Sequence, residues 1–212
     1  MALNEGGGVS AIYLSVSNGK LVRQFKTEAD IEGLVSRVNK KGNTVWEKHY
    51  QSVEGVITGI EKKESDFGVD WKLTLTDDGE RYIISMPYSS RYTNAFFKVI
   101  KNIDLKKAIV FNPWQMQDKN NPTKTVSGVS VKQDGKKIEP YFTKENPNGL
   151  PQMVKMTVKE KGKNVDKWDD TDLMNFFEDM IEKDIKPLLS KPVAASAKVY
   201  SNEDVEDEEP PF

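Results

Sequence analysis

Alternating apolar and polar residues, interrupted by glycine-containing turns, most limit how this chain can fold. Residues 9–25 place Ile12, Leu14 and Val16 at every second position before a Ser17-Asn18-Gly19 turn, and apolar residues resume after it. A period of two puts alternate side chains on one face of a β-strand. Asn-Gly supplies the positive φ angles that a two-residue hairpin turn requires. The segment therefore predicts a β-hairpin at the start of a mainly β protein.

Five more strands and a helix are predicted in the middle of the chain. The strands are residues 44–60, 69–76, 81–86, 107–112 and 126–132, with residues 113–125 as a polar loop. The helix follows the third strand, is capped by Ser89 or Ser90, and carries an apolar stripe of Phe96, Val99, Ile100 and Ile103. Three strands, a helix and two strands is the order of the oligonucleotide-binding (OB) fold, a five-stranded Greek-key barrel. We therefore expect an OB-fold with extra N-terminal elements.

Apolar residues at helical spacing predict two further helices. Residues 28–39 form the first, with Gly42 as its stop. Residues 170–189 form a C-terminal helix, with residues 169–171 as its cap. One more strand is expected at residues 153–158 in the turn-rich region between the barrel and this helix.

Length and composition exclude several classes of protein. The chain has no cysteine, which excludes disulfide frameworks, thiolate metal sites and a cysteine nucleophile. It has no run of about 18 apolar residues and no signal peptide, so we expect a cytoplasmic protein without a membrane partner. Its 212 residues suffice for one sizeable core. We expect one domain at residues 1–190, followed by a flexible linker and acidic tail at residues 191–212.

No group of residues predicts an enzyme or a cofactor. The single histidine, His49, lies in an alternating strand, and no serine has the surroundings of a nucleophile elbow. Gly6-Gly7-Gly8 lacks the Gly-Lys-Ser/Thr ending of a phosphate loop. Four aspartates near the last helix could bind a metal, but their position favours helix capping and interaction with the helix dipole. They are Asp166, Asp169, Asp170 and Asp172.

The net charge of −2 conceals an asymmetry along the chain. Residues 202–212 hold six acidic residues and no basic one, which leaves 31 basic against 27 acidic residues in the remainder. A basic body with an acidic tail is typical of nucleic-acid binding combined with an interaction tail.

Basic and aromatic side chains are interleaved along the predicted barrel, which is what phosphate contacts and base stacking on a single strand require. The predicted groove crosses Trp46, Lys48, Tyr50, Trp71 and Tyr82, and is gripped by Phe67 and Trp114. The other predicted contacts are Lys62, Lys63, Lys72, Tyr88, Arg91, Tyr92, Lys119 and Lys124. Trp46, Lys48 and Tyr50 occupy alternate positions and so share one face. Trp71 and Tyr82 alternate with apolar residues, and a core position is the alternative for both.

The last seven residues, Glu206-Asp207-Glu208-Glu209-Pro210-Pro211-Phe212, are the most specific motif in the chain. Charge repulsion keeps such a segment extended, and a terminal ring with a free carboxylate suits a pocket rimmed by Arg or Lys on a partner. The motif resembles the tails of single-stranded DNA-binding proteins of bacteria and their phages. Those tails end in several acids, an apolar residue and Pro-Phe; here Pro210 occupies the usual aliphatic position.

This resemblance implies a sequence-independent single-stranded DNA-binding protein of the phage type, acting in DNA replication, recombination and repair in a host cytoplasm. It implies that the tail recruits a polymerase, primase or helicase and competes with DNA for the basic groove. The tail residues concerned are Glu206, Asp207, Glu208, Glu209, Pro211 and Phe212.

Two other functions stay open from the residues alone. One is a protein-interaction module whose acidic tail mimics DNA. The other is a metal-dependent nuclease that uses Asp169 or Asp170. A preference for DNA over RNA leaves no sequence signature, because it rests on contacts to the 2′-hydroxyl.

Overall fold

The computed structural model describes residues 11–27, 31–39, 41–66, 68–160 and 163–189. The strands are β1 (Ala11–Ser17), β2 (Lys20–Phe25), β3 (Leu34–Val38), β4 (Thr44–Tyr50), β5 (Val53–Ser65), β6 (Gly68–Asp77), β7 (Glu80–Pro87), β8 (Ala108–Asp118), β9 (Asn121–Gln133), β10 (Lys136–Lys137), β11 (Val154–Glu160) and β12 (Lys163–Asp169). The helices are α1 (Arg91–Val99) and α2 (Thr171–Met180), with a 3-10 turn at Ile100–Asn102 after α1. A π-helical turn (Ile181–Ile185) and a 3-10 turn (Lys186–Leu188) extend α2.

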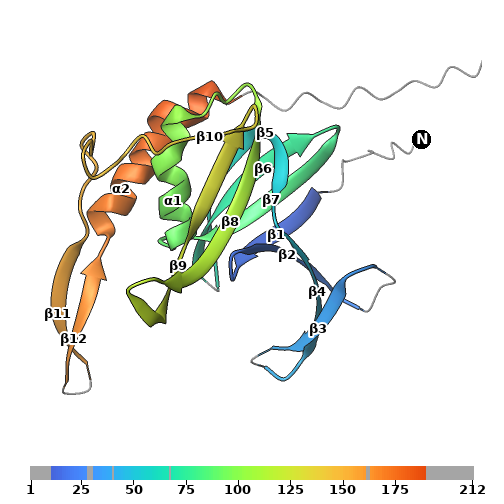
Figure 1. The fold of residues 1–212 in the computed structure, drawn as a ribbon, viewed down its shortest axis with the longest axis horizontal. Coiled ribbons are helices and arrows are strands. Elements are labelled where there is room, and N and C mark those ends of the chain that lie inside the picture. Colours follow the sequence, from blue (N-terminus) through green and yellow to red (C-terminus); the bar gives the residue numbers. More distant parts are fainter. Residues whose placement is uncertain (1–10, 28–30, 40, 67, 161–162, 190–212) are drawn as a thin grey trace, which may run out of the picture.

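Ten strands form one open sheet in the order β10-β9-β8-β5-β6-β7-β1-β2-β4-β3, shown in Figure 1. All neighbouring strands are antiparallel except β1 and β7, which are parallel. The prediction of a five-stranded OB barrel is wrong. The order of three strands, a helix and two strands is present in β5, β6, β7, α1, β8 and β9. However, β1 occupies the edge of β7 that a closing strand would need, so the sheet continues into β2, β4 and β3.

The N-terminal hairpin is confirmed, and its turn lies directly against β8. Asn18 and Gly19 have φ angles of 50° and 72°, as an Asn-Gly turn requires. The Gly19 N–H donates to the Tyr92 hydroxyl at 2.8 Å. A Cβ atom at Gly19 would lie 2.4 Å from the backbone nitrogen of Gln115. The curved sheet therefore brings its N-terminal part against β8, and glycine is needed at the contact.

Three local predictions of secondary structure are wrong. Within the predicted helix 28–39, the structure has the edge strand β3, which pairs with β4 along its whole length. The predicted strand 44–60 is interrupted at Gln51 and Ser52 and forms β4 and β5. The predicted loop 113–125 is the far end of the β8–β9 hairpin. Backbone pairing with the next strand of a hairpin stabilises the first and third of these segments as strands, whatever their own propensity.

Two helices cover one face of the sheet and close the core (Figure 1). Phe97 of α1 meets Trp71 of β6 edge to face, with ring centroids 5.0 Å apart, and meets Phe177 of α2 at 5.4 Å. The predicted cap of α1 is confirmed, because Ser90 Oγ accepts a hydrogen bond from the Thr93 N–H. The predicted C-terminal helix is also present, with its first ten residues α-helical and the rest in the π and 3-10 turns.

Strands β11 and β12 form a separate two-stranded sheet that projects beside α2 (Figure 1). The strand predicted at residues 153–158 corresponds to β11, whereas β12 was not predicted. In the described part of the chain, no helix is long and apolar enough to cross a membrane.

Replacing Gly19 by Ala should destabilise the protein much more than replacing Gly79. Both glycines have positive φ angles, 72° and 81°, so each alanine costs about 1–2 kcal/mol in backbone strain. A new Cβ at Gly79 meets nothing within 4 Å, whereas one at Gly19 overlaps β8. We expect Gly19→Ala to lower the free energy of unfolding by a further ~1–3 kcal/mol in urea titrations. Equal effects of the two changes would contradict the close packing of the turn on β8.

Candidate nucleic-acid interface

One face of α1 and the strand β9 line a groove of about 500 Å³, which we call the α1–β9 groove. The helix contributes residues spaced i, i+3, i+4, i+7 and i+8, which lie on a single helix face. These residues are Arg91, Asn94, Ala95, Lys98 and Val99. The other lining residues come from β8, β9, the segment around β10, the residue before β11, and α2: Trp114, Ser127, Val129, Ser130, Lys137, Ile138, Pro140, Met153 and Leu173.

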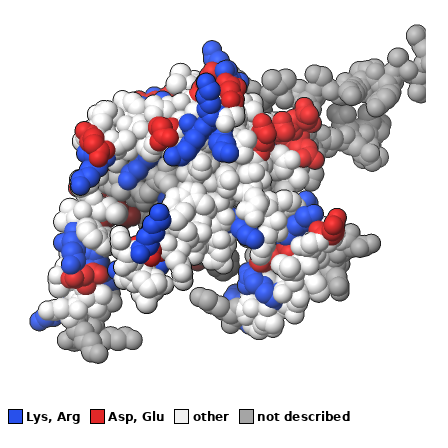
Figure 2. Space-filling view, viewed as in Figure 1, with Lys and Arg blue, Asp and Glu red and all other residues white. Residues whose placement is uncertain are grey.

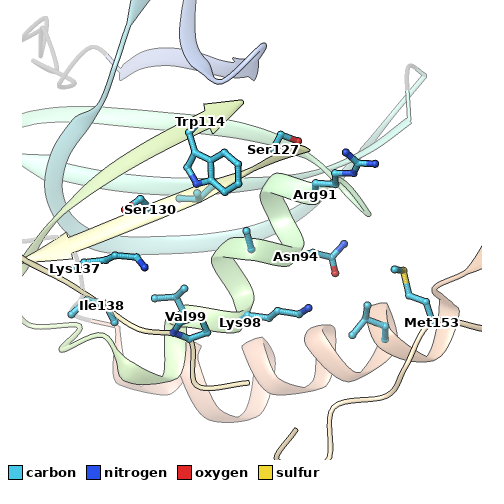
Figure 3. A pocket seen from close by; sticks show the side chains of 14 residues that line it. Arg91, Asn94, Lys98, Val99, Trp114, Ser127, Ser130, Lys137, Ile138 and Met153 are labelled. Atoms are coloured by element: carbon cyan, nitrogen blue, oxygen red, sulfur yellow. The ribbon is translucent and has the colours of Figure 1, made fainter. Parts of the chain in front are cut away.

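The α1–β9 groove is basic. Arg91, Lys98 and Lys137 line it, and none of its described lining residues is acidic. Figure 3 shows the three basic side chains and Trp114 around the same hollow, and Figure 2 shows Lys and Arg side chains bordering the pale centre of this face. An Arg91 Nη1 donates to the Thr125 carbonyl, and Lys137 Nζ lies 3.3 Å from Glu139 Oε1 outside the lining. A concave surface lined by one sign of charge attracts anions of the opposite sign.

Trp114 lies in β8 rather than in the predicted loop, and its half-buried indole lines the groove. The ring passes close over Gly128 of β9, which is opposite Trp114 in the sheet. A Cβ atom at Gly128 would lie 2.9 Å from Trp114 Cζ2, so glycine leaves the space that the indole occupies. The neighbouring predicted residue Tyr92 accepts the Gly19 N–H and thus joins α1 to the N-terminal hairpin.

A second surface with rings and basic groups lies on β2 and β4, and we call it the arm face. Its members are Arg23, Phe25, Trp46, Lys48 and Tyr50; Phe25 is opposite Trp46 and Arg23 is opposite Lys48. The predicted sharing of one face by the three β4 residues is therefore confirmed. Arg23 lies 4.9 Å from the Phe25 ring centroid, and Lys48 Nζ lies 5.7 Å from that of Tyr50. The two β2 residues were not predicted, although their alternate positions match those of the β4 residues.

Beside the arm face, acidic residues surround Tyr82. A cavity of about 370 Å³ is lined by Arg23, Tyr50 and Tyr82 together with Glu54, Asp77 and Glu80. The Tyr82 hydroxyl donates to Glu80, and this hydrogen bond is the main reason why the pKa of Tyr82 is raised to about 12. Three carboxylates at this end repel phosphate, so the arm face is a weaker candidate for a DNA path than the α1–β9 groove.

Strands β2, β4 and β3 form the end of the sheet that we call the arm. On the side opposite the arm face, a buried carboxylate joins these strands. Glu47 is only 4% exposed, and its Oε1 accepts hydrogen bonds from Arg37 (2.6 Å) and Gln24 (3.1 Å). The other carboxylate oxygen lies 3.4 Å from His49 Nε2. The hydrogen bond from Arg37 is the largest cause of a lowered pKa for Glu47. The single histidine therefore contacts a carboxylate two residues away in its own strand, β4.

Several predicted contacts serve the core instead. Trp71 is 1% exposed, so the prediction that it stacks on a base is wrong, and the predicted groove through it does not exist. Tyr88 stacks on Trp71 with centroids 6.3 Å apart, and its hydroxyl donates to Glu178 of α2. Lys62 donates to the same carboxylate at 2.7 Å, so Lys62 and Tyr88 fasten α2 to the sheet.

The remaining predicted residues lie apart from both surfaces or outside the described residues. Lys63 pairs with Glu61, and Lys72 donates to Asp70 and Ser85. Lys119 and Lys124 are exposed near the tip of the β8–β9 hairpin. Phe67 and the tail residues 206–212 lie outside the described residues.

Two of the four aspartates near α2, Asp166 and Asp169, act as local hydrogen-bond acceptors. Asp169 accepts from the Thr171 N–H at 3.0 Å and from its hydroxyl at 2.6 Å, as expected beside a helix N-terminus. Asp166 pairs with Lys155 at 2.6 Å. Asp170 makes no side-chain capping bond. Among the residues that the structure describes, no group of three or more His, Asp or Glu side chains could hold a metal ion.

Comparisons with protein-family models, with characterised proteins and with solved structures found no match to this chain.

The charge of Glu47 should make the arm pH-dependent. Its pKa is lower in the folded protein than the unfolded value of about 4.3, so its stabilising contribution is complete above that value and is lost as the pH falls through the folded pKa. We expect Glu47→Gln to lower the free energy of unfolding by about 1 kcal/mol at pH 6 and by less at pH 3, as measured by urea titration. Glu64→Gln, at an exposed site, is the control. A loss that is the same at both pH values would argue against a charge-dependent contact.

Proposed function

We propose that this protein binds single-stranded DNA without sequence preference, and that the α1–β9 groove is the primary contact surface. The observation that carries the proposal is the composition of the groove lining, which combines Arg91, Lys98 and Lys137 with Trp114 and, among the residues that the structure describes, has no acidic residue. Basic groups contact phosphates, and an indole stacks on any base, because every base has a π-face. Neither contact reads a base edge, so binding is tolerant of sequence.

The split of charge along the chain supports the same function. The six acids of residues 202–212 give the tail the same sign as DNA, while the remainder of the chain is basic. A tail of this kind competes with DNA for a basic groove and presents Phe212 to partner proteins. We propose that these partners are replication proteins, such as a polymerase, primase or helicase, and that the protein acts in the cytoplasm.

Removing two groove charges should weaken DNA binding in a salt-dependent way. We expect the double change Arg91→Ala and Lys98→Ala to lower affinity for labelled oligo-dT at least tenfold at low salt. The slope of log affinity against log salt should decrease by about 0.7 for each phosphate that the variant no longer neutralises. The matched control removes Lys183 and Lys186, two lysines of the α2 end that pair with acids four residues away. Fluorescence anisotropy measures the affinity of both variants for oligo-dT. Equal affinities would contradict the proposal that DNA binds in the α1–β9 groove.

The arm face provides the test of an alternative location. Lys48→Ala removes one of the two basic side chains of the arm face, and Lys48 lies beside half-buried aromatic rings. If Lys48→Ala weakens binding and the groove variant does not, single-stranded DNA binding stands but the primary surface is the arm. If the wild-type protein fails to bind oligo-dT at low salt, the proposed function itself is wrong.

Deleting residues 203–212 should strengthen DNA binding, because it removes a competing polyanion. Absence of DNA binding both with and without the tail would favour a protein-interaction module. A metal-dependent nuclease would instead cut oligonucleotides when Mg²⁺ is added, and Asp170→Asn would abolish the cutting. We expect no cutting, and gel analysis of the same oligonucleotides after incubation with Mg²⁺ provides the measurement.

A further inference from the structure

The β11–β12 sheet is a two-stranded ribbon, and within the described part of the chain its two strands pair only with each other. Seven residue pairs join the strands, from Val154–Asp169 to Glu160–Lys163. A two-stranded sheet is marginally stable alone in water, and large apolar side chains are costly to expose. Nevertheless Trp168 is 63% exposed, which is the highest value among the described tryptophans. The ribbon therefore has the properties of a surface that a ligand covers.

Register divides the ribbon into two unlike faces. Lys155 is opposite Trp168, Thr157 is opposite Asp166, and Lys159 is opposite Asn164, so one face carries the indole and two lysines. We call this the Trp168 face. The other face carries Lys167 and Asp169, opposite Met156 and Val154 respectively, together with the aliphatic residues, which are exposed in part: Val154, Met156, Val158 and Val165. The large ring thus lies beside Lys155 and Lys159, on the face opposite the aliphatic residues.

The ribbon begins and ends at the α1–β9 groove. Met153, the residue before β11, lines the groove, and so does Leu173 of α2, four residues after β12 ends. Figure 3 shows Met153 at the same side of the hollow as Arg91. Both strands of the ribbon therefore leave from the border of the groove, and a polymer that lies in the groove passes the base of the ribbon.

We propose that the Trp168 face is a second contact segment for the same DNA strand, beyond the groove. This inference rests on the proposed function. Trp168 stacks on a base, and Lys155 and Lys159 contact phosphates. Asp166 now pairs with Lys155 at 2.6 Å, and this hydrogen bond is the largest cause of the lowered pKa of Asp166. A phosphate oxygen offers Lys155 a contact of the same kind. When DNA binds, the phosphate therefore replaces Asp166 as the partner of Lys155 or shares Lys155 with it.

Oligonucleotide length separates the two segments experimentally. An oligo-dT of about 6 nucleotides fits within one segment, whereas one of about 30 nucleotides spans both, given that single-strand sites take roughly 4–16 nucleotides. We expect Trp168→Ala to lower the affinity for the long oligonucleotide roughly tenfold and to leave the affinity for the short one unchanged. Trp168→Phe keeps a ring and should restore most of the affinity. Because the side chain is exposed, both variants should melt at the wild-type temperature.

The aliphatic face provides the matched control and the opposite outcome. Met156→Ala changes the face without Trp168 and should not alter affinity for either oligonucleotide. The proposal is overturned if Trp168→Ala binds the long oligonucleotide as tightly as the wild type does. It is also overturned if sedimentation shows a wild-type dimer that either variant dissociates without any change in DNA affinity, since the ribbon would then join two copies of the chain. Failure of the wild-type protein to bind either oligonucleotide would instead refute the proposed function.

Discussion

The parallel pairing of β1 with β7 is the interaction on which the rest of the architecture depends. Five residue pairs, from Ala11–Arg81 to Ser15–Ser85, fill the edge of β7 that would otherwise be free. Once that edge is taken, the sheet extends through β2 and β4 to β3 instead of closing. The same pairing positions the Asn18-Gly19 turn against β8, where the Gly19 N–H reaches Tyr92 of α1. One strand pairing thus determines the arm, the curvature and the support behind α1.

Helix α1 connects the core to the candidate DNA surface. Phe96 and Phe97 are fully buried and contact Phe111 and Trp71, respectively. The face of the same helix that carries Arg91 and Lys98 lines the groove. Because aromatic packing holds the inner face rigidly, the basic side chains project from a well-fixed backbone. A site built on such a helix binds with a smaller entropy cost than one built on a loop.

Charge decides between the two surfaces that contain rings. The arm face has more aromatic side chains, but three carboxylates lie around Tyr82 at its end. The α1–β9 groove has one indole and three basic residues, with no acid in its described lining. For a polyanion, phosphate contacts supply most of the non-specific affinity, so the groove is favoured over the arm. The indole of the groove, Trp114, is half-buried, whereas the indole of the ribbon, Trp168, is exposed.

Patterns of neighbouring residues were sufficient to predict some elements of the fold, but they predicted little of the candidate site. Asn18-Gly19 predicted its turn, Ser89 or Ser90 predicted the start of α1, and alternation placed Trp46, Lys48 and Tyr50 on one face. These features depend on residues close together in the chain, where backbone geometry and side-chain period act directly. The apolar pattern of residues 28–39 failed for the opposite reason, since pairing with β4 imposes strand geometry on the described residues Leu34–Val38.

The candidate site combines residues far apart in the chain, and only packing brings them together. Sequence patterns singled out Arg91 and Trp114 but neither Lys98 nor Lys137. Spacing from Arg91 along a helix would have suggested Lys98, whereas Lys137 meets the groove only because β10 pairs with β9. Trp71 was predicted as a contact but is buried. Its alternation with Leu73 and Leu75 is compatible with a buried or an exposed face of the strand, and packing of the helices decides that this face is buried. Period and turn chemistry are properties of neighbours in the chain, but burial and the meeting of distant charges depend on which surfaces pack together.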